Sequence, residues 1–180
     1  NAQIMARRQR MYDAGETIVF SMIGLHEQRK GHLVLFKAIK NLLERRLDLL
    51  GKFKVIIEGR GDLTPSFEEF VLQNDLTRVT EFRKDIVGLD KLYAETDVLV
   101  HPSLSSEDLP NVISEALLFG IPVIGSRLAG IPTQVIPEFN GFLFQPGDVS
   151  QLSDLLEQVL DATDTLGFLS ANSVEVFTQK

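Results

Sequence analysis

Residues 100–122 read VHPSLSSEDLPNVISEALLFGIP, and this stretch predicts a buried strand, a polar loop and a helix, in that order. The polar loop covers residues 103–107, and Asp108 is a candidate cap for the helix that follows it. Pro110 falls in the first helical turn, where proline is tolerated because its missing N–H would have no helical partner. One side of the helix is apolar and is expected to face the core: Ile113, Ala116, Leu117 and Gly120.

The same alternation of short apolar runs and amphipathic stretches continues along the chain in both directions. The runs, each of strand length, are residues 17–23 (TIVFSMI), 54–57 (KVII), 78–82 (RVTEF), 97–100 (DVLV), 122–125 (PVIG) and 141–144 (GFLF). Nearly continuous hydrophobicity is typical of strands buried on both faces of a parallel sheet. The helical stretches are residues 32–50, 66–73, 89–95, 110–119, 132–136 and 149–160, with Ser150 as a candidate cap of the last. The sequence therefore predicts an α/β fold, a Rossmann-like doubly wound parallel sheet of about six strands with helices on both faces.

The domain organisation follows from the same pattern. Residues 13–162 are expected to form the sheet domain, and residues 163–180 a helical tail, for which packing against a part outside this chain is one interpretation. Asn1-Ala2 resembles the remnant of a cleaved expression tag, so residues 1–12 are expected to be that remnant and a linker. The basic run at residues 5–10 (MARRQR) has too few arginines for a nucleic-acid or membrane patch, which favours a solvated linker.

Composition excludes several classes of function. The 180 residues are 44% hydrophobic and 24% charged, as in one ordinary globular domain. A net charge of −7 argues against a nucleic-acid partner. The absence of cysteine excludes a disulfide framework and a thiolate metal site, and it fits a reducing cytoplasm. No apolar run approaches the ~20 residues that span a bilayer, and no secretory signal is present.

The loops at the carboxyl ends of the strands are the expected ligand site, because doubly wound sheets bind ligands there. These loops are residues 24–31, 58–65, 101–111 and 126–132. Glu107 ends the third loop and Glu115 lies within the helix that follows, so the two flank a helix N-terminus, which attracts an anionic diphosphate. Pro110 cannot donate, so the amides of Asn111 and Val112 are the expected phosphate contacts. A carboxylate accepts two hydroxyl hydrogens at once, which suits the ribose and sugar of a nucleotide sugar.

Several short motifs, in order, resemble the C-terminal domain of the family 4 (group 1) glycosyltransferases, which have the GT-B architecture of two facing Rossmann-like domains. The resemblance covers residues 17–160, and its E-x7-E signature is specific only in the company of the other motifs. The matching segments are Gly24…Lys30-Gly31, Gly59-Arg60-Gly61, Pro102-Ser103, Glu107…Glu115 and residues 140–148 (NGFLFQPGD).

The resemblance implies roles for individual residues. Glu107 would hold hydroxyls of the transferred sugar, Glu115 the ribose diol, and Lys30 the diphosphate, with no metal ion and no other cofactor. It further implies a UDP- or GDP-sugar as donor and retention of anomeric configuration. An N-terminal domain outside this chain would bind the acceptor, so this chain alone is expected to be inactive. The EDLPN variant resembles transferases of bacterial cell-surface polysaccharides, which implies a cytoplasmic enzyme with peripheral membrane contact through that other domain.

The sequence departs from the family pattern at three places. Leu25 stands where the family usually has arginine, and Arg29 is a candidate to supply the missing charge. Thr133 follows Pro132 where the family has glutamate. A glycine after the third strand is replaced near Arg83-Lys84, where family members contact the base.

Simpler interpretations stay open beside these roles. Glu107 and Glu115 could be exposed acids, and Lys30 a solvated residue before a helix. His26, His32 and His101 are expected to be structural, since a lone histidine seldom marks a site. Gly59 and Gly61 could allow close approach of a ligand or form a tight turn. Two other functions remain: a GT-B epimerase or phosphorylase, and a non-catalytic sugar-nucleotide-binding module.

Overall fold

The structure, a computed structural model, describes residues 17–84, 88–105 and 108–179. Its centre is a six-stranded sheet in the order β3-β2-β1-β4-β5-β6, in which every neighbouring pair is parallel. The strands are β1 (Ile18–Ile23), β2 (Phe53–Glu58), β3 (Thr80–Arg83), β4 (Val98–His101), β5 (Val123–Ser126) and β6 (Gly141–Phe144). All six predicted strands are therefore confirmed, with shifts of one or two residues at some ends.

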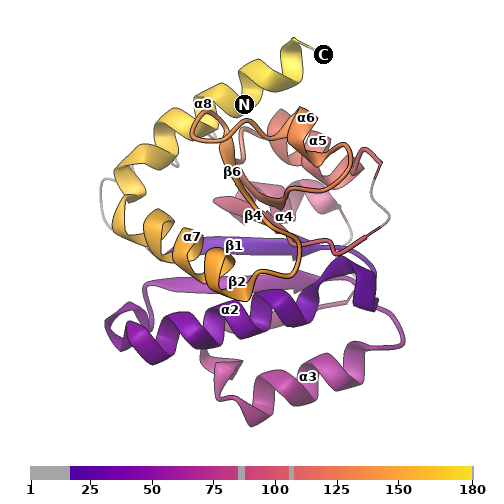
Figure 1. Cartoon of the computed structure of the whole chain (residues 1–180), viewed down its shortest axis with the longest axis vertical. Coiled ribbons are helices and arrows are strands. Elements are labelled where there is room, and N and C mark those ends of the chain that lie inside the picture. Colours follow the sequence, from indigo (N-terminus) through magenta and orange to yellow (C-terminus); the bar gives the residue numbers. More distant parts are fainter. Residues whose placement is uncertain (1–16, 85–87, 106–107, 180) are drawn as a thin grey trace.

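Helices cover both faces of this sheet, as predicted (Figure 1). One face carries α2 (His32–Arg45), α3 (Thr64–Gln73) and α7 (Val149–Asp161). The other carries α4 (Leu89–Glu95), α5 (Asn111–Leu118) and α6 (Ile131–Gln134). Helix α8 (Leu166–Thr178) reaches both cores, with Leu166 and Leu169 in the first and Val176 in the second. Short 3-10 turns complete the chain at Gln28–Lys30, Leu47–Leu49, Leu76–Arg78 and Thr163–Thr165.

Strand β1 shows why two hydrophobic cores form. All six of its residues are buried, and their side chains alternate between the faces. Phe20 and Met22 belong to the core under α2, α3 and α7, whereas Val19 and Ile23 belong to the core on the opposite face. Such a strand is apolar at nearly every position because neither face reaches water.

Helix α2 is shorter than the predicted helix over residues 32–50. The backbone leaves the helical region at Arg46, with φ −131° and ψ 63°, and a 3-10 turn follows. The Arg46 guanidinium donates to Asp48 at 2.9–3.0 Å, to Glu157 at 2.8 Å and to Asp161 at 2.9–3.1 Å. These contacts hold the end of α2 against α7, and a straight continuation of the helix would break them.

Two predicted helix caps are wrong. Helix α7 is capped by Asp148, whose Oδ1 accepts the amide hydrogen of Gln151 at 2.9 Å, and Ser150 lies in the first turn. Helix α5 begins after Pro110 without a side-chain cap, so Asp108 does not fill that role. In each case the proline or aspartate nearest the start has the extended backbone that a cap position requires.

The C-terminal helix α8 packs on the domain itself, and its contact with a part outside this chain stays a prediction. It lies along α5, with Leu166 and Leu169 buried (Figure 1). Ser170 donates to the Gly120 carbonyl at 2.5 Å, and Asn172 donates to the Phe139 carbonyl at 2.8 Å.

Candidate functional site

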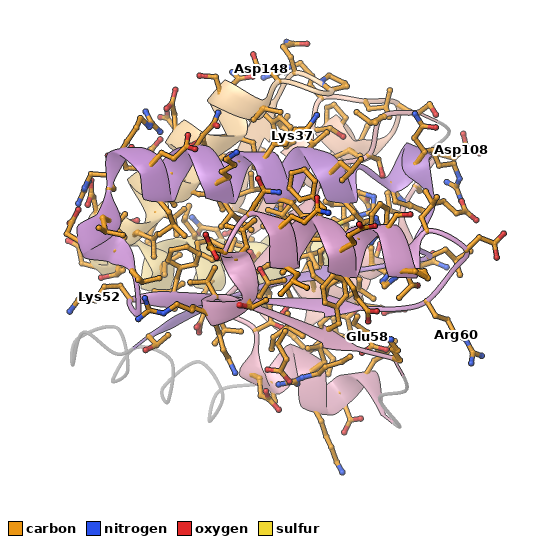
Figure 2. All side chains as sticks on the ribbon, turned by 90° about the horizontal axis from the view of Figure 1, so that it is seen from below. Lys37, Lys52, Glu58, Arg60, Asp108 and Asp148 are labelled. Atoms are coloured by element: carbon orange, nitrogen blue, oxygen red, sulfur yellow. The ribbon has the colours of Figure 1, made fainter. Side chains whose placement is uncertain are left out.

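The strand order places a topological switch point between β1 and β4. The chain runs from β1 to β2 and β3 on one side and from β4 to β5 and β6 on the other, so the loops after β1 and β4 diverge there. Figure 2 shows Glu58, Arg60 and Asp108 at one end of the molecule and Lys52 at the opposite end. The carboxyl ends of the strands, with the predicted ligand loops, thus share one edge of the sheet.

The loops after β1 and β4 are in direct backbone contact. The amide of Leu104 donates to the Arg29 carbonyl at 2.7 Å. Gly31 is in the left-handed region at φ 80°, and a Cβ there would overlap the carbonyl oxygen of Pro102. Only glycine fits this position, so the loop that carries Arg29 and Lys30 is fixed against the loop that leads into α5.

The two glycines after β2 serve a similar close approach, to protein backbone. A Cβ at Gly59, whose φ is 136°, would overlap the carbonyl of Gly24. A Cβ at Gly61 would come within 2.7 Å of the His26 carbonyl oxygen. Both glycines therefore let the loop after β2 pack on the loop after β1.

Lys30 and Arg29 occupy different surroundings within their loop. The Lys30 side chain is half-buried and passes over Gly24, with its Cδ 3.9 Å from the position of a Cβ on that glycine. The Arg29 Nε donates to Glu27 Oε2 at 2.7 Å, so this carboxylate offsets part of the charge that Arg29 would bring. Leu25 is 53% exposed and adds no charge to the edge.

Helix α5 places the other predicted residues on the far side of the switch point. The amides of Ile113 and Ser114 donate to the Pro110 carbonyl, and these are the first hydrogen bonds of helix α5. The amides of Asn111 and Val112 come before them, in the first turn, where helix N–H groups have no partner within the helix. Asn111 is exposed and Val112 half-buried. Glu115 is half-buried one turn further along the helix. Glu107 lies outside the described residues, and its predicted role remains a prediction.

Sequence reasoning missed the residue that holds Glu115. Tyr93 of α4 is 2% exposed, and its hydroxyl donates to Glu115 Oε2 at 2.6 Å. Burial and, to a smaller extent, the hydrogen bond to Glu115 raise the pKa of the Tyr93 phenol. The phenol therefore keeps its proton and remains a hydrogen-bond donor. The signal was available, because a tyrosine within a buried helical stripe usually finds a partner for its hydroxyl.

The three histidines are buried, in agreement with the structural role expected of them. The His32 ring stacks on Phe67 with centroids 4.7 Å apart, and His26 lies edge-on to His32 at 4.8 Å. The Nδ1 of His26 is 2.7 Å from the Thr64 hydroxyl. His101 ends β4, and its Nε2 is 3.2 Å from the Ser103 hydroxyl.

The cations at the end of β3, Arg83 and Lys84, form ion pairs with acids. Arg83 donates to Glu81 at 2.6 Å and to Glu95 at 3.1 Å, and the Lys84 Nζ lies 2.6 Å from Glu68. Both charges are therefore partly offset near the position where the family resemblance implies contact with a base.

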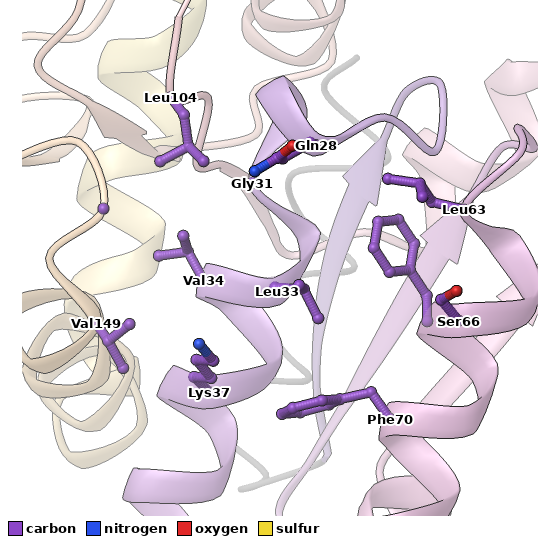
Figure 3. Close-up of a pocket in the computed structure, with 12 residues that line it drawn as sticks. Gln28, Gly31, Leu33, Val34, Lys37, Leu63, Ser66, Phe70, Leu104 and Val149 are labelled. Atoms are coloured by element: carbon purple, nitrogen blue, oxygen red, sulfur yellow. The ribbon is translucent and has the colours of Figure 1, made fainter.

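A mostly apolar hollow of about 540 Å³ opens beside the loop after β1 (Figure 3). Leu33 and Lys37 from α2, with Phe70 from α3, line one part of it, and Gln28 and Leu104 lie nearer the switch point. Among residues 17–84, 88–105 and 108–179, no three His, Asp or Glu side chains gather in a way that could hold a metal ion. Within the same ranges, no helix has both the length and the apolar character needed to cross a membrane.

The chain matches the sequence model of a known family and resembles several characterised proteins. The family is described as "Glycosyl transferases group 1", and residues 16–162 match it. The chain is 34% identical to the sulfoquinovosyl transferase of Arabidopsis thaliana over 128 aligned residues. These residues cover 69% of this chain and 24% of that protein. It is 30% identical over 168 residues to the D-inositol 3-phosphate glycosyltransferase of Corynebacterium diphtheriae, covering 88% of this chain and 38% of the relative. An Escherichia coli galactosyltransferase, named for UDP-galactose and a diphosphoundecaprenol-linked sugar, is 30% identical over 87% of this chain and 40% of its own length.

Solved structures share the fold. Anabaena HepE in complex with UDP and glucose superimposes with a TM-score of 0.82 at 20% identity, over 99% of this chain and 48% of that protein. The C-terminal domain of a group 1 glycosyltransferase from Francisella tularensis gives 0.78 at 20% identity, over 96% of this chain and 92% of that domain. This chain spans from a quarter to two-fifths of the length of the relatives named above. It belongs to the group 1 glycosyltransferases, and its fold matches that of the solved C-terminal domain.

Proposed function

We propose that this chain is the donor-binding domain of a retaining glycosyltransferase that moves a sugar from a nucleoside diphosphate sugar to a saccharide or lipid-linked acceptor. The observation that carries this proposal is the backbone contact between the Lys30 loop and the loop that enters α5, at the switch point of the sheet. The contact brings a cation-bearing loop beside a helix N-terminus, and both attract a diphosphate.

Each predicted residue has a physical role in this proposal. Lys30 neutralises charge that develops on the diphosphate leaving group, which needs no metal ion if the lysine reaches it. The amides of Asn111 and Val112 donate to phosphate oxygens, and Arg29 adds charge beyond what Glu27 offsets. Glu115 accepts the ribose hydroxyls. Glu107 is assigned to the hydroxyls of the transferred sugar on its place in the E-x7-E motif.

The biological setting is part of the same proposal. The E. coli relative takes its name from a UDP-sugar and a lipid-linked acceptor, which supports UDP as the nucleotide, with GDP as the alternative. A cell-surface polysaccharide is the proposed product because of the resemblance of residues 107–111 (EDLPN). An N-terminal domain beyond this chain would bind the acceptor. The enzyme would then work in the cytoplasm, and that second domain would make any peripheral contact with the membrane.

Calorimetry with UDP and GDP tests the donor site. Glu115→Ala and Lys30→Ala are each expected to weaken binding of the preferred nucleotide about tenfold or more, as the loss of a charge-assisted hydrogen bond does. Lys52→Ala is the matched control, because Lys52 is exposed at the opposite end of the molecule (Figure 2). Unchanged affinity in both site variants, beside a parent that binds, would overturn the assignment.

One observation favours a second candidate, a domain that binds the donor without transferring sugar. Leu25, where the family usually has arginine, is exposed and uncharged. A longer protein with its N-terminal domain that binds the nucleotide sugar, yet glycosylates no lipid or saccharide acceptor, would favour this candidate. Donor hydrolysis or epimerisation without an acceptor would instead indicate another GT-B enzyme.

A further inference from the structure

Tyr93 is fixed to helix α5 at two points one turn apart. Its hydroxyl donates to Glu115 Oε2 at 2.6 Å, and its ring stacks on Phe119 with centroids 5.2 Å apart and an angle of 27° between the planes. The ring is almost fully buried, whereas Glu115 is half-buried. Glu115 Oε2 therefore contacts the buried Tyr93, and another part of the Glu115 side chain is accessible to solvent.

The contact is of a kind that restricts a carboxylate strongly. An O–H···O⁻ bond of this length is charge-assisted, and the phenol lies on a ring that stacking and burial hold in place. A free glutamate side chain samples many rotamers, and ordering it on binding lowers affinity. With Oε2 held by Tyr93, Glu115 is ordered before any ligand arrives. Oε1 and the remaining lone pair of Oε2 are then available to accept two hydroxyl hydrogens.

We infer that Tyr93 is a positioning residue, which aims Glu115 at the ribose diol and makes the domain prefer ribonucleotides over 2′-deoxyribonucleotides. This inference rests on the proposed function, because it needs Glu115 to contact the ribose. Tyr93 itself lies on α4, behind Glu115, and acts only through that carboxylate. Its effect should consequently appear with ligands that carry the full diol and vanish with those that lack one hydroxyl.

The test compares ribo- and deoxyribonucleotide affinities for the 180-residue chain. UDP and GDP are each titrated beside their 2′-deoxy forms by calorimetry, and the nucleotide that the parent binds better is used throughout. Tyr93→Phe keeps the ring and removes only the hydroxyl. We expect it to weaken binding of the ribonucleotide about fivefold and to change binding of the deoxy form less than about twofold.

Two further variants separate positioning from packing. Glu115→Gln should remove the preference for ribose, and Tyr93→Phe added to Glu115→Gln should then cause no further loss, since the two residues act as one unit. Phe119→Leu disturbs the stack while it leaves the hydroxyl contact possible, so it should lower the ribose preference less than Tyr93→Phe does. Thermal unfolding checks that each variant is folded.

The outcomes distinguish this inference from the proposed function beneath it. A parent that binds no nucleoside diphosphate, or a Glu115→Gln variant with the parent's affinities, overturns the proposed function and this inference with it. If Glu115→Gln loses the ribose preference while Tyr93→Phe retains it, the donor site stands and the role of Tyr93 is overturned. Equal losses for both nucleotides in Tyr93→Phe also overturn it, because they indicate a purely structural residue.

Discussion

His32 should make this domain sensitive to mild acid. The imidazole is 1% exposed at the start of α2, between Phe67 and His26. Burial and, second, the nearby charge of His26 lower its pKa from 6.5 to about 3, a shift that the Glu27 backbone offsets only in part. The folded protein therefore holds His32 neutral down to a pH of about 3.

The sign and size of the effect follow from proton linkage. Because the folded pKa is the lower one, the unfolded chain binds a proton that the folded chain rejects as the pH falls below 6.5. The contribution of His32 to stability is complete above that pH and is lost at about 1.4 kcal/mol per pH unit as the pH falls towards 3. Between pH 7.5 and pH 5.0 the loss is about 2 kcal/mol.

The substitution His32→Phe isolates this term. Phenylalanine preserves the stack on Phe67 and cannot take up a proton. Urea unfolding of parent and variant at pH 7.5 and 5.0 should show that the parent loses about 2 kcal/mol more than the variant over this interval. Any change in packing appears equally at both pH values, and Phe36→Leu, a nearby core substitution without a titrating group, should show the parent's pH dependence. The same pH dependence in His32→Phe and the parent would refute the reasoning.

Three further outcomes are expected. Gly31→Ala should destabilise the domain by more than the ~1 kcal/mol of a left-handed alanine and should weaken nucleotide binding, because its Cβ overlaps the Pro102 carbonyl. Gly51→Ala is its control, since that glycine has φ 87° and no atom within 4 Å of an added Cβ; equal effects on stability and binding would contradict the account of the loop contact. Asp148→Ala should cost about 1 kcal/mol in urea unfolding through loss of the α7 cap, while Ser150→Ala should cost less than half of that. Nucleotide affinity should be the same in EDTA and in Mg²⁺. A marked dependence on Mg²⁺ would indicate that a metal ion, together with Lys30, neutralises the charge of the diphosphate.

The sequence predicts the inner strands well because β1, β2, β4 and β5 are largely buried on both faces. Such strands are apolar at almost every position, and β1 and β2 are recognisable without reference to their neighbours. Helix ends were harder to predict. The end of α2 depends on the contact of Arg46 with acids more than 100 residues away in sequence, as the separation of 111 positions from Glu157 shows. No local pattern around residue 46 contains that information.

The candidate site was predictable in its loops and less so in its details. The positions of Lys30 and of the start of α5 follow from strand order and from the rule that ligands bind at the carboxyl ends of strands. The sequence indicates that the Tyr93 hydroxyl needs a partner but does not identify Glu115 as that partner, because the two residues lie on helices of different crossovers, 22 positions apart. Likewise, Gly31 could be recognised as part of a motif, but its overlap with Pro102 appears only once two distant loops are in place.

Helix α7 has a consequence for folding during synthesis. It follows the last strand, yet it returns to lie along α2 near the beginning of the chain (Figure 1). Leu152, Leu156 and Val159 complete the core on that face. A ribosome must therefore release almost the whole domain before α7 can pack on α2. Until then the nascent chain exposes an apolar helix surface, and a chaperone that shields such surfaces should bind it during this interval.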